Sequence, residues 1–161
     1  MRAYIWKLLL DADLNSRYWK ELAERYSSRE KKFKIFLAIM ASGTVATWGI
    51  WDNIPILWKL LSGISAILSI ALPILNYPEQ IKQMSCLSGQ WAELRIKYEQ
   101  QWVKIRNISD SNKIDKLVEC YNDEQVKLEE LESTLPKDVK LLKKCQSDVL
   151  ASRGLKNKKE K

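Results

Sequence analysis

The chain has 161 residues, with 27 Lys and Arg against 20 Asp and Glu, and a formal net charge of +7. It has no histidine, which excludes Ser-His triads, Cys-His pairs and imidazole metal sites. Its five glycines form no phosphate-cradling loop, and its three cysteines stand far apart without a C-x-x-C motif. The sequence therefore predicts no enzyme, no metal site and no cofactor.

A leader helix is predicted over residues 1–32. Its apolar residues recur at helical spacing, first as Ile5, Leu8, Leu9 and Ala12 and then as Leu14, Tyr18, Leu22 and Tyr26. Asp13 or Asn15 could cap a break between two pieces of this helix. No Gly or Pro lies between Leu14 and Phe33, so we expect the leader to continue into the segment that follows.

Two uncharged stretches follow, Ile35 to Trp51 with 17 residues and Leu60 to Pro78 with 19. A bilayer core about 30 Å thick is crossed by roughly 20 apolar residues of helix. The short connection around Asp52 returns the second stretch directly, which predicts a transmembrane hairpin over 33–77 with spans at 33–51 and 56–76. A pair of buried helices in a soluble protein is the alternative, but the other segments are too charged to wrap it.

Positive charge gives the orientation. Residues 1–34 hold nine Lys or Arg, and five of these lie directly before the first span, whereas the connection holds only Asp52. Positive residues stay cytoplasmic, so both termini are predicted to face the cytoplasm. Trp48, Trp51 and Trp58 would mark the outer interface, and Phe33 and Tyr77 the inner one.

Small and polar residues recur within both spans. They are Ala38, Ser42, Ala46 and Gly49 in the first, and Ser62, Ser65 and Ser69 in the second. Such stripes let helices pack closely, or they face a water column. Two helices cannot enclose a channel, so a pore requires a homo-oligomer.

Helices are predicted across 78–152. Pro73 should kink the second span, and Pro78 suits the start of the next helix, so both are hinge candidates. Near-heptad spacing then predicts a coiled-coil-like helix through Leu87, Trp91, Leu94, Tyr98, Trp102 and Ile105. A further helix uses Ile114, Leu117, Tyr121, Gln125, Leu128 and Leu131, and a short one uses Val139, Leu142, Cys145 and Val149.

The fold class is therefore an all-α membrane protein, with a two-helix hairpin and a cytoplasmic helical bundle or coiled-coil region. The bundle would be filled by Tyr18, Trp19, Tyr26, Trp91, Tyr98 and Trp102, although tryptophans could instead line a ligand pocket. Residues 153–161 form a basic tail that we expect to be disordered.

The block from Leu72 to Gln83, with Trp91-Ala92-Glu93-Leu94-Arg95 after it, resembles the SLATT family of two-transmembrane effectors in bacterial conflict systems. Arg17-Tyr18-Trp19 resembles the family's leader helix, and the likeness spans residues 14–105. A histidine common after the family's exit motif is absent. The resemblance implies a pore-forming effector of the bacterial inner membrane, triggered by a sensor protein or a nucleotide second messenger.

The sequence thus favours a membrane effector of an antiviral, abortive-infection type of system that oligomerises in the bilayer. The alternatives are a passive membrane anchor or scaffold and a phage holin-like protein. The lipid bilayer and further copies of the chain are the expected partners, and no specific nucleic acid is expected because the positive charge is dispersed.

Overall fold

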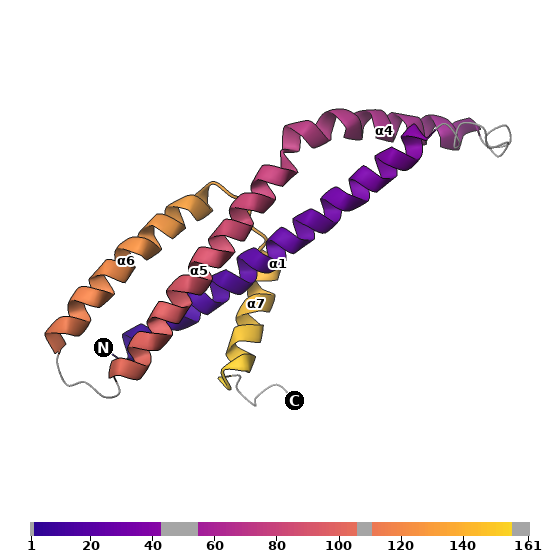
Figure 1. The fold of residues 1–161 in the computed structure, drawn as a ribbon. Coiled ribbons are helices and arrows are strands. Elements are labelled where there is room, and N and C mark those ends of the chain that lie inside the picture. The colour runs from indigo at the N-terminus through magenta and orange to yellow at the C-terminus, as the bar shows by residue number, and fades with distance from the viewer. Residues whose placement is uncertain (1, 43–54, 106–110, 156–161) are drawn as a thin grey trace. The chain divides into compact units, whose positions relative to one another are not determined.

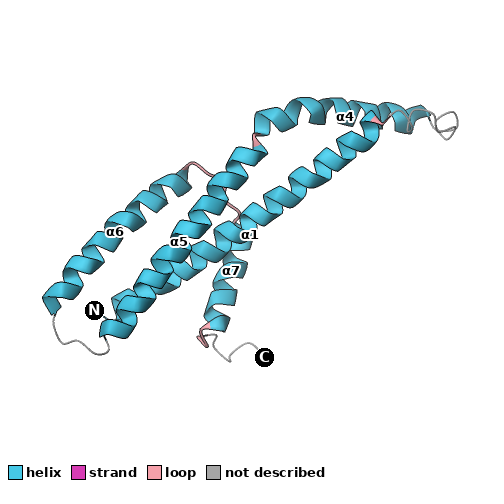
Figure 2. Ribbon diagram, in the orientation of Figure 1, coloured by secondary structure: helices cyan, strands magenta, loops and turns pink. Residues whose placement is uncertain are grey.

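A computed structural model describes residues 2–42, 55–105 and 111–155 (Figure 1). It contains the helices α1 (Arg2–Ala41), α4 (Pro55–Leu75), α5 (Tyr77–Ile105), α6 (Ser111–Ser133) and α7 (Val139–Ser152). No strand occurs in these ranges, so the expected all-α class is confirmed for them (Figure 2). The chain forms two compact units, which we call the packed unit (Met1–Ala23 with Lys82–Lys161) and the apolar unit (Glu24–Ile81).

Helix α1 runs without interruption from Arg2 to Ala41, so the leader does continue into the first apolar stretch. The predicted break at Asp13 or Asn15 is wrong. Asp13 lies within the helix and is 1% exposed, because its carboxylate has partners elsewhere in the packed unit. Asp13 therefore does not cap a helix, although its position in the sequence suggested a helix N-cap.

The core of the packed unit is a seam between α1 and α5. The buried residues of α5 are Met84, Leu87, Trp91, Leu94, Tyr98 and Gln101, which follow one another at alternating steps of 3 and 4. Those of α1 include Ile5, Leu9, Ala12, Ser16, Trp19 and Ala23, with the same alternation. The helices are antiparallel, since the rings of Trp6 and Trp102 lie 5.3 Å apart and Ser88 Oγ donates to Ser16 O at 2.9 Å.

The seam confirms most of the predicted stripe on α5 but not its end. Gln101 is buried at the position that continues the heptad, whereas Trp102 is half-buried and packs against Trp6. The side chain of Ile105 lies outside the described part. Among the predicted aromatic fillers, Tyr18, Trp19, Trp91 and Tyr98 are buried in this core, while Tyr26 belongs to the apolar unit.

Helix α6 lies beside α5 and runs antiparallel to it (Figure 1). Lys97 Nζ contacts Glu124 Oε2 at 2.8 Å, and the rings of Tyr98 and Tyr121 meet edge to face at 5.8 Å. Leu128 is buried, but Leu131 is 52% exposed, so the expected apolar stripe of α6 is not buried throughout. The described part of this helix is therefore attached by polar contacts as well as by apolar ones.

A glutamate near the end of α6 accepts a hydrogen bond from a tryptophan of the seam. Glu132 Oε1 accepts a hydrogen bond from Trp19 Nε1 at 2.7 Å. Burial raises the pKa of the Glu132 carboxyl, and the hydrogen bond from the indole N–H of Trp19 partly offsets that rise. Because Trp19 is almost fully buried, this bond satisfies an indole donor that would otherwise lack a partner.

Helix α7 is capped and tied to α1. The carboxylate of Asp138 accepts from Lys140 N and Leu141 N, and the backbone N–H of Asp138 donates to Tyr18 Oη at 2.8 Å. Its buried face is Leu141, Cys145 and Val149. The predicted buried face is wrong in part, because Val139 is 63% exposed and Leu142 is 37% exposed. The buried residues of α7 instead repeat every four positions.

A buried ion cluster joins the two ends of the packed unit. Asp13 Oδ1 accepts from Arg17 Nε at 2.8 Å, and Asp13 Oδ2 accepts from Arg153 Nη2 at 3.0 Å. Burial raises the pKa of the Asp13 carboxyl, but the hydrogen bonds and charges of the two arginines outweigh it and leave this pKa below its usual value. Arg153, which the sequence grouped with the tail 153–161, thus holds the end of α7 to α1; residues 156–161 lie outside the described residues.

Replacing Asp13 by Asn should lower the free energy of unfolding of the packed unit by about 2 kcal/mol, because charge-assisted hydrogen bonds are lost while the arginines can turn to water. The matched control is Glu99→Gln. Glu99 is half exposed, and its Oε1 lies as far as 3.8 Å from Arg153 Nη1. Loss of this ion pair should therefore lower the free energy of unfolding by less than about 0.5 kcal/mol. Denaturant unfolding of the full chain in detergent, followed by tryptophan fluorescence, measures both. Equal effects would contradict a special role for Asp13.

The same cluster should make stability depend on pH. A carboxyl whose pKa is lower in the folded than in the unfolded state stabilises the fold at pH values above its unfolded pKa, about 3.9. This stabilisation is lost as pH falls through the lower, folded pKa. Wild type should thus lose stability below about pH 4 more steeply than Asp13→Asn, in unfolding curves recorded across that range. Parallel acid profiles would show that other carboxyls dominate.

Candidate functional site

The apolar unit carries the residues that the sequence singled out. Ala38 is exposed on α1, and Ser42 directly follows this helix, where its backbone N–H donates to Ile39 O at 3.0 Å. Ser62, Ser65 and Ser69 lie on α4. Ala46, Gly49, Trp48 and Trp51 fall outside the described residues, as does the side chain of Trp58. The stripe of the second span can therefore be examined, and that of the first only at its beginning.

Large apolar side chains of this unit face outward. Among the described side chains of residues 24–42 and 56–81, none is buried. Seven of them are isoleucines or leucines that are more than half exposed: Ile35, Ile39, Ile56, Leu60, Ile67, Ile70 and Ile74. The five on α4 are spaced by 4, 7, 3 and 4 positions and so lie along one face of that helix. We call the surfaces of α1 and α4 that carry these seven side chains the exposed apolar face. The described residues of the packed unit have no exposed set of isoleucines and leucines of this size.

Two of the three serines of α4, Ser65 and Ser69, are hydrogen-bonded within their own helix. Ser65 Oγ donates to Leu61 O at 2.9 Å, and Ser69 Oγ donates to Ser65 O at 2.8 Å. Ser62 and Ser65 are half-buried, whereas Ser69 is exposed. A hydroxyl that bonds to the carbonyl four residues earlier needs neither water nor a second helix. In this arrangement the serine stripe is compatible with an apolar environment.

Three aromatic rings connect α1 to the first residue of α5, just after the end of α4. The Tyr77 ring lies 5.7 Å from that of Tyr26 and 6.4 Å from that of Phe33. Arg29 adds its guanidinium over the Tyr26 ring, 5.8 Å from the centroid. Phe33 and Tyr77, which the sequence placed at one interface, are thus neighbours in space.

The break between α4 and α5 lies at Asn76, between the two hinge candidates. Asn76 has a φ of +44°, a left-handed conformation that asparagine adopts more readily than other side chains. Gln80 Nε2 donates to Leu75 O at 3.1 Å and satisfies a carbonyl at the end of α4. Pro73 lies inside α4, and Pro78 is the second residue of α5, so each removes one backbone donor near the break.

Among the described residues, no single helix is both long and apolar enough to cross a membrane. One pair passes by length and composition, namely Lys59–Leu75 with Tyr77–Lys104, which are bent by 42° at their break.

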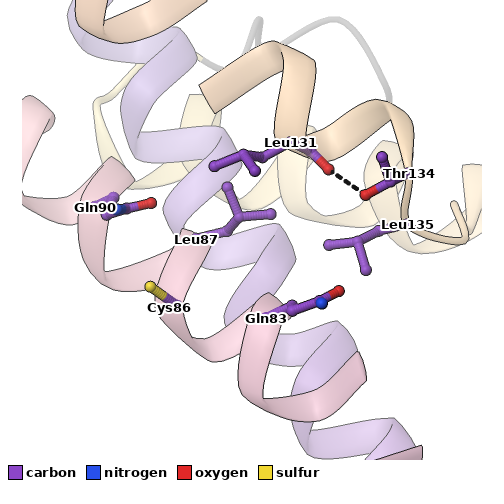
Figure 3. Close-up of a pocket in the computed structure, with 7 residues that line it drawn as sticks. All are labelled: Gln83, Cys86, Leu87, Gln90, Leu131, Thr134 and Leu135. Atoms are coloured by element: carbon purple, nitrogen blue, oxygen red, sulfur yellow. Dashed lines mark hydrogen bonds between the residues drawn. The ribbon is translucent and has the colours of Figure 1, made fainter. Parts of the chain in front are cut away.

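The packed unit has a shallow hollow of about 200 Å³ between α5 and the end of α6 (Figure 3). Gln83, Cys86 and Gln90 line it from α5, opposite Leu131 and Leu135. The Thr134 hydroxyl is already used, since it donates to Leu131 O at 2.8 Å. This hollow is not the tryptophan-lined ligand pocket considered from the sequence. No tryptophan lines it, and Trp19 and Trp91 are buried in the core. The Cys86 thiol is exposed and that of Cys145 is buried.

Comparison of the chain with known protein families, with curated proteins and with solved structures found no match in any of the three.

The conformation of Asn76 gives a direct prediction. Asn76→Ala should destabilise the break by about 1 kcal/mol, because the short polar side chain of asparagine offsets the strain of the left-handed region through local hydrogen bonding and the methyl group of alanine does not. Asn76→Gly tolerates that φ and should stay near wild type. Thermal unfolding in detergent, followed by circular dichroism, compares the two. If alanine were tolerated as well as glycine, the left-handed turn would not be a constraint on this junction.

Proposed function

We propose that the chain is a membrane effector. Its apolar unit lies in the bacterial inner membrane with both termini in the cytoplasm. Several copies assemble, and a signal from a sensor protein or a nucleotide messenger makes them open a pore or disrupt the bilayer. The antiviral role is proposed from the resemblance to the SLATT family, which rests on the blocks around Leu72–Gln83 and Trp91–Arg95.

The exposed apolar face of α1 and α4 carries the membrane proposal. Each of its seven more than half exposed isoleucines and leucines would gain on the order of 1 kcal/mol on leaving water. Together these gains are comparable with the whole stability of a small domain. A monomeric soluble protein rarely leaves such a face uncovered, and a bilayer covers it without a partner.

Charge and polarity agree with this placement. Residues 60–78 contain no formal charge, and the hydroxyls of Ser65 and Ser69 are satisfied by carbonyls of α4. The one cation near the start of α4, Lys59, is exposed and has a long stem that can extend toward an interface. The hydroxyls of Ser65 and Ser69 therefore need no water in the middle of the bilayer.

A passive anchor is the second candidate, and the same serine bonds favour it. Hydroxyls that bond to their own helix offer nothing to a water column in this conformation. In that case the packed unit would carry the activity by binding a partner. Exchange of residues 33–77 for an unrelated hairpin separates the two candidates, since an anchor survives the exchange and a pore does not.

Vesicle leakage tests the pore directly. Full-length protein is reconstituted at rising protein-to-lipid ratios, and flotation in a density gradient first verifies insertion. Release of a small dye should rise more steeply than in proportion to protein density, because a pore needs several copies. Ser62→Leu with Ser65→Leu should reduce release several-fold, whereas the control Ile67→Leu with Ile70→Leu, on the exposed face, should not. Inserted protein that never leaks would favour the anchor.

A further inference from the structure

Three cations near the end of the exposed apolar face lack a compensating charge. Arg29, Lys31 and Lys32 are exposed on α1, and in the described part of the chain none of them forms an ion pair with a carboxylate. Lys34 differs, because its Nζ lies 2.6 Å from Glu30 Oε1. We call Arg29, Lys31 and Lys32 the cationic collar.

The two lysines of the collar are in register with the exposed isoleucines of the same helix. Lys31 and Lys32 precede Ile35, which is 60% exposed, by four and three positions, so all three lie on one side of α1. Ile39, 53% exposed, continues that side. A cation and an isoleucine on one side of a helix face the same surroundings at different depths.

The depth difference matches the headgroup layer of a membrane. At a rise of 1.5 Å per residue, Lys31 and Lys32 lie about 5–6 Å below Ile35 along the axis, and Arg29 about 9 Å below. The polar layer of each leaflet is roughly 5–7 Å thick, the difference between a 30 Å core and a 40–45 Å bilayer shared by two sides. With Ile35 at the edge of the hydrocarbon, Lys31 and Lys32 therefore lie at the depth of the lipid phosphates. Arg29 lies just beyond this layer, and its long side chain can reach a phosphate.

From this register we infer that the cationic collar binds the phosphate groups of anionic phospholipids and concentrates these lipids around the inner end of the hairpin. The inference rests on the proposed membrane placement. Single-stranded nucleic acid, the other common polyanion, fits less well, because it also needs free aromatic faces for its bases. The nearby rings of Tyr26, Phe33 and Tyr77 are half-buried and engaged with one another.

Arg29 contributes a fixed charge to the collar. Its guanidinium is held over the Tyr26 ring at 5.8 Å, so less side-chain freedom is lost when it binds a phosphate. The two lysines add point charges that a fluid headgroup layer can follow. Each basic residue close to an anionic membrane surface strengthens the attraction to that surface roughly fivefold, the factor that corresponds to about 1 kcal/mol.

The test compares spin-labelled phosphatidylglycerol with spin-labelled phosphatidylcholine around the full chain in phosphatidylcholine vesicles. Electron paramagnetic resonance separates the motionally restricted lipid that touches the protein from the bulk. The restricted fraction of phosphatidylglycerol should exceed that of phosphatidylcholine about threefold or more at low salt, and the ratio should fall toward one at high salt.

The triple variant R29Q/K31Q/K32Q should bring the ratio close to one at low salt as well. The matched control K137Q/K140Q/K143Q removes the same charge from exposed positions of the packed unit and should leave it unchanged. Equal restriction of both lipids by wild type, or a preference that survives the triple variant, would overturn the collar. The complete absence of a restricted component would instead overturn the membrane placement itself, and circular dichroism verifies that each variant stays helical.

Discussion

Burial of large side chains along the seam between α1 and α5 is the interaction on which the packed unit depends. Trp19, Trp91 and Tyr98 are almost fully buried there, and each buried aromatic side chain removes a large apolar area from water. The seam also decides where the other helices attach. Helix α6 reaches it through Glu132 on Trp19 and Gln125 on Tyr98, while α7 reaches it through Asp138 on Tyr18.

The two units show opposite uses of the same kind of residue. In the packed unit, isoleucine and leucine such as Ile5 and Leu94 are buried, and polar groups such as Asp13 are paired. In the apolar unit, isoleucines such as Ile56 and Ile74 are the most exposed large apolar side chains, and no described side chain is buried. Helix α1 takes part in both, and the change occurs along its own length, between the buried Leu22 and the exposed Ile35. This contrast, rather than any single residue, is the basis of the proposal that the apolar unit lies in lipid.

Much of the packed unit could be predicted from apolar spacing alone, because Leu87, Trp91, Leu94 and Tyr98 repeat at the period of a packed helix and are buried. The errors occur where a distant partner decides. Trp102 leaves the seam to pack against Trp6, and Asp13 is an ion-pair partner of Arg153, 140 positions away, rather than a helix cap. Position in a local pattern cannot reveal such a partner. For the candidate site, spacing identified the serines of α4, but that their hydroxyls bond to Leu61 and Ser65 follows only from the three-dimensional arrangement.

Those serine bonds also bear on how a hairpin of this kind could change its character. A hydroxyl leaves its own carbonyl by rotation about one side-chain bond, so the polarity of the α4 surface at Ser65 and Ser69 can change while every backbone hydrogen bond stays in place. Passage from a dry to a wetted surface would then require no unwinding. The free-energy cost of this wetting would depend on how many neighbouring copies of the chain together form a continuous path for water.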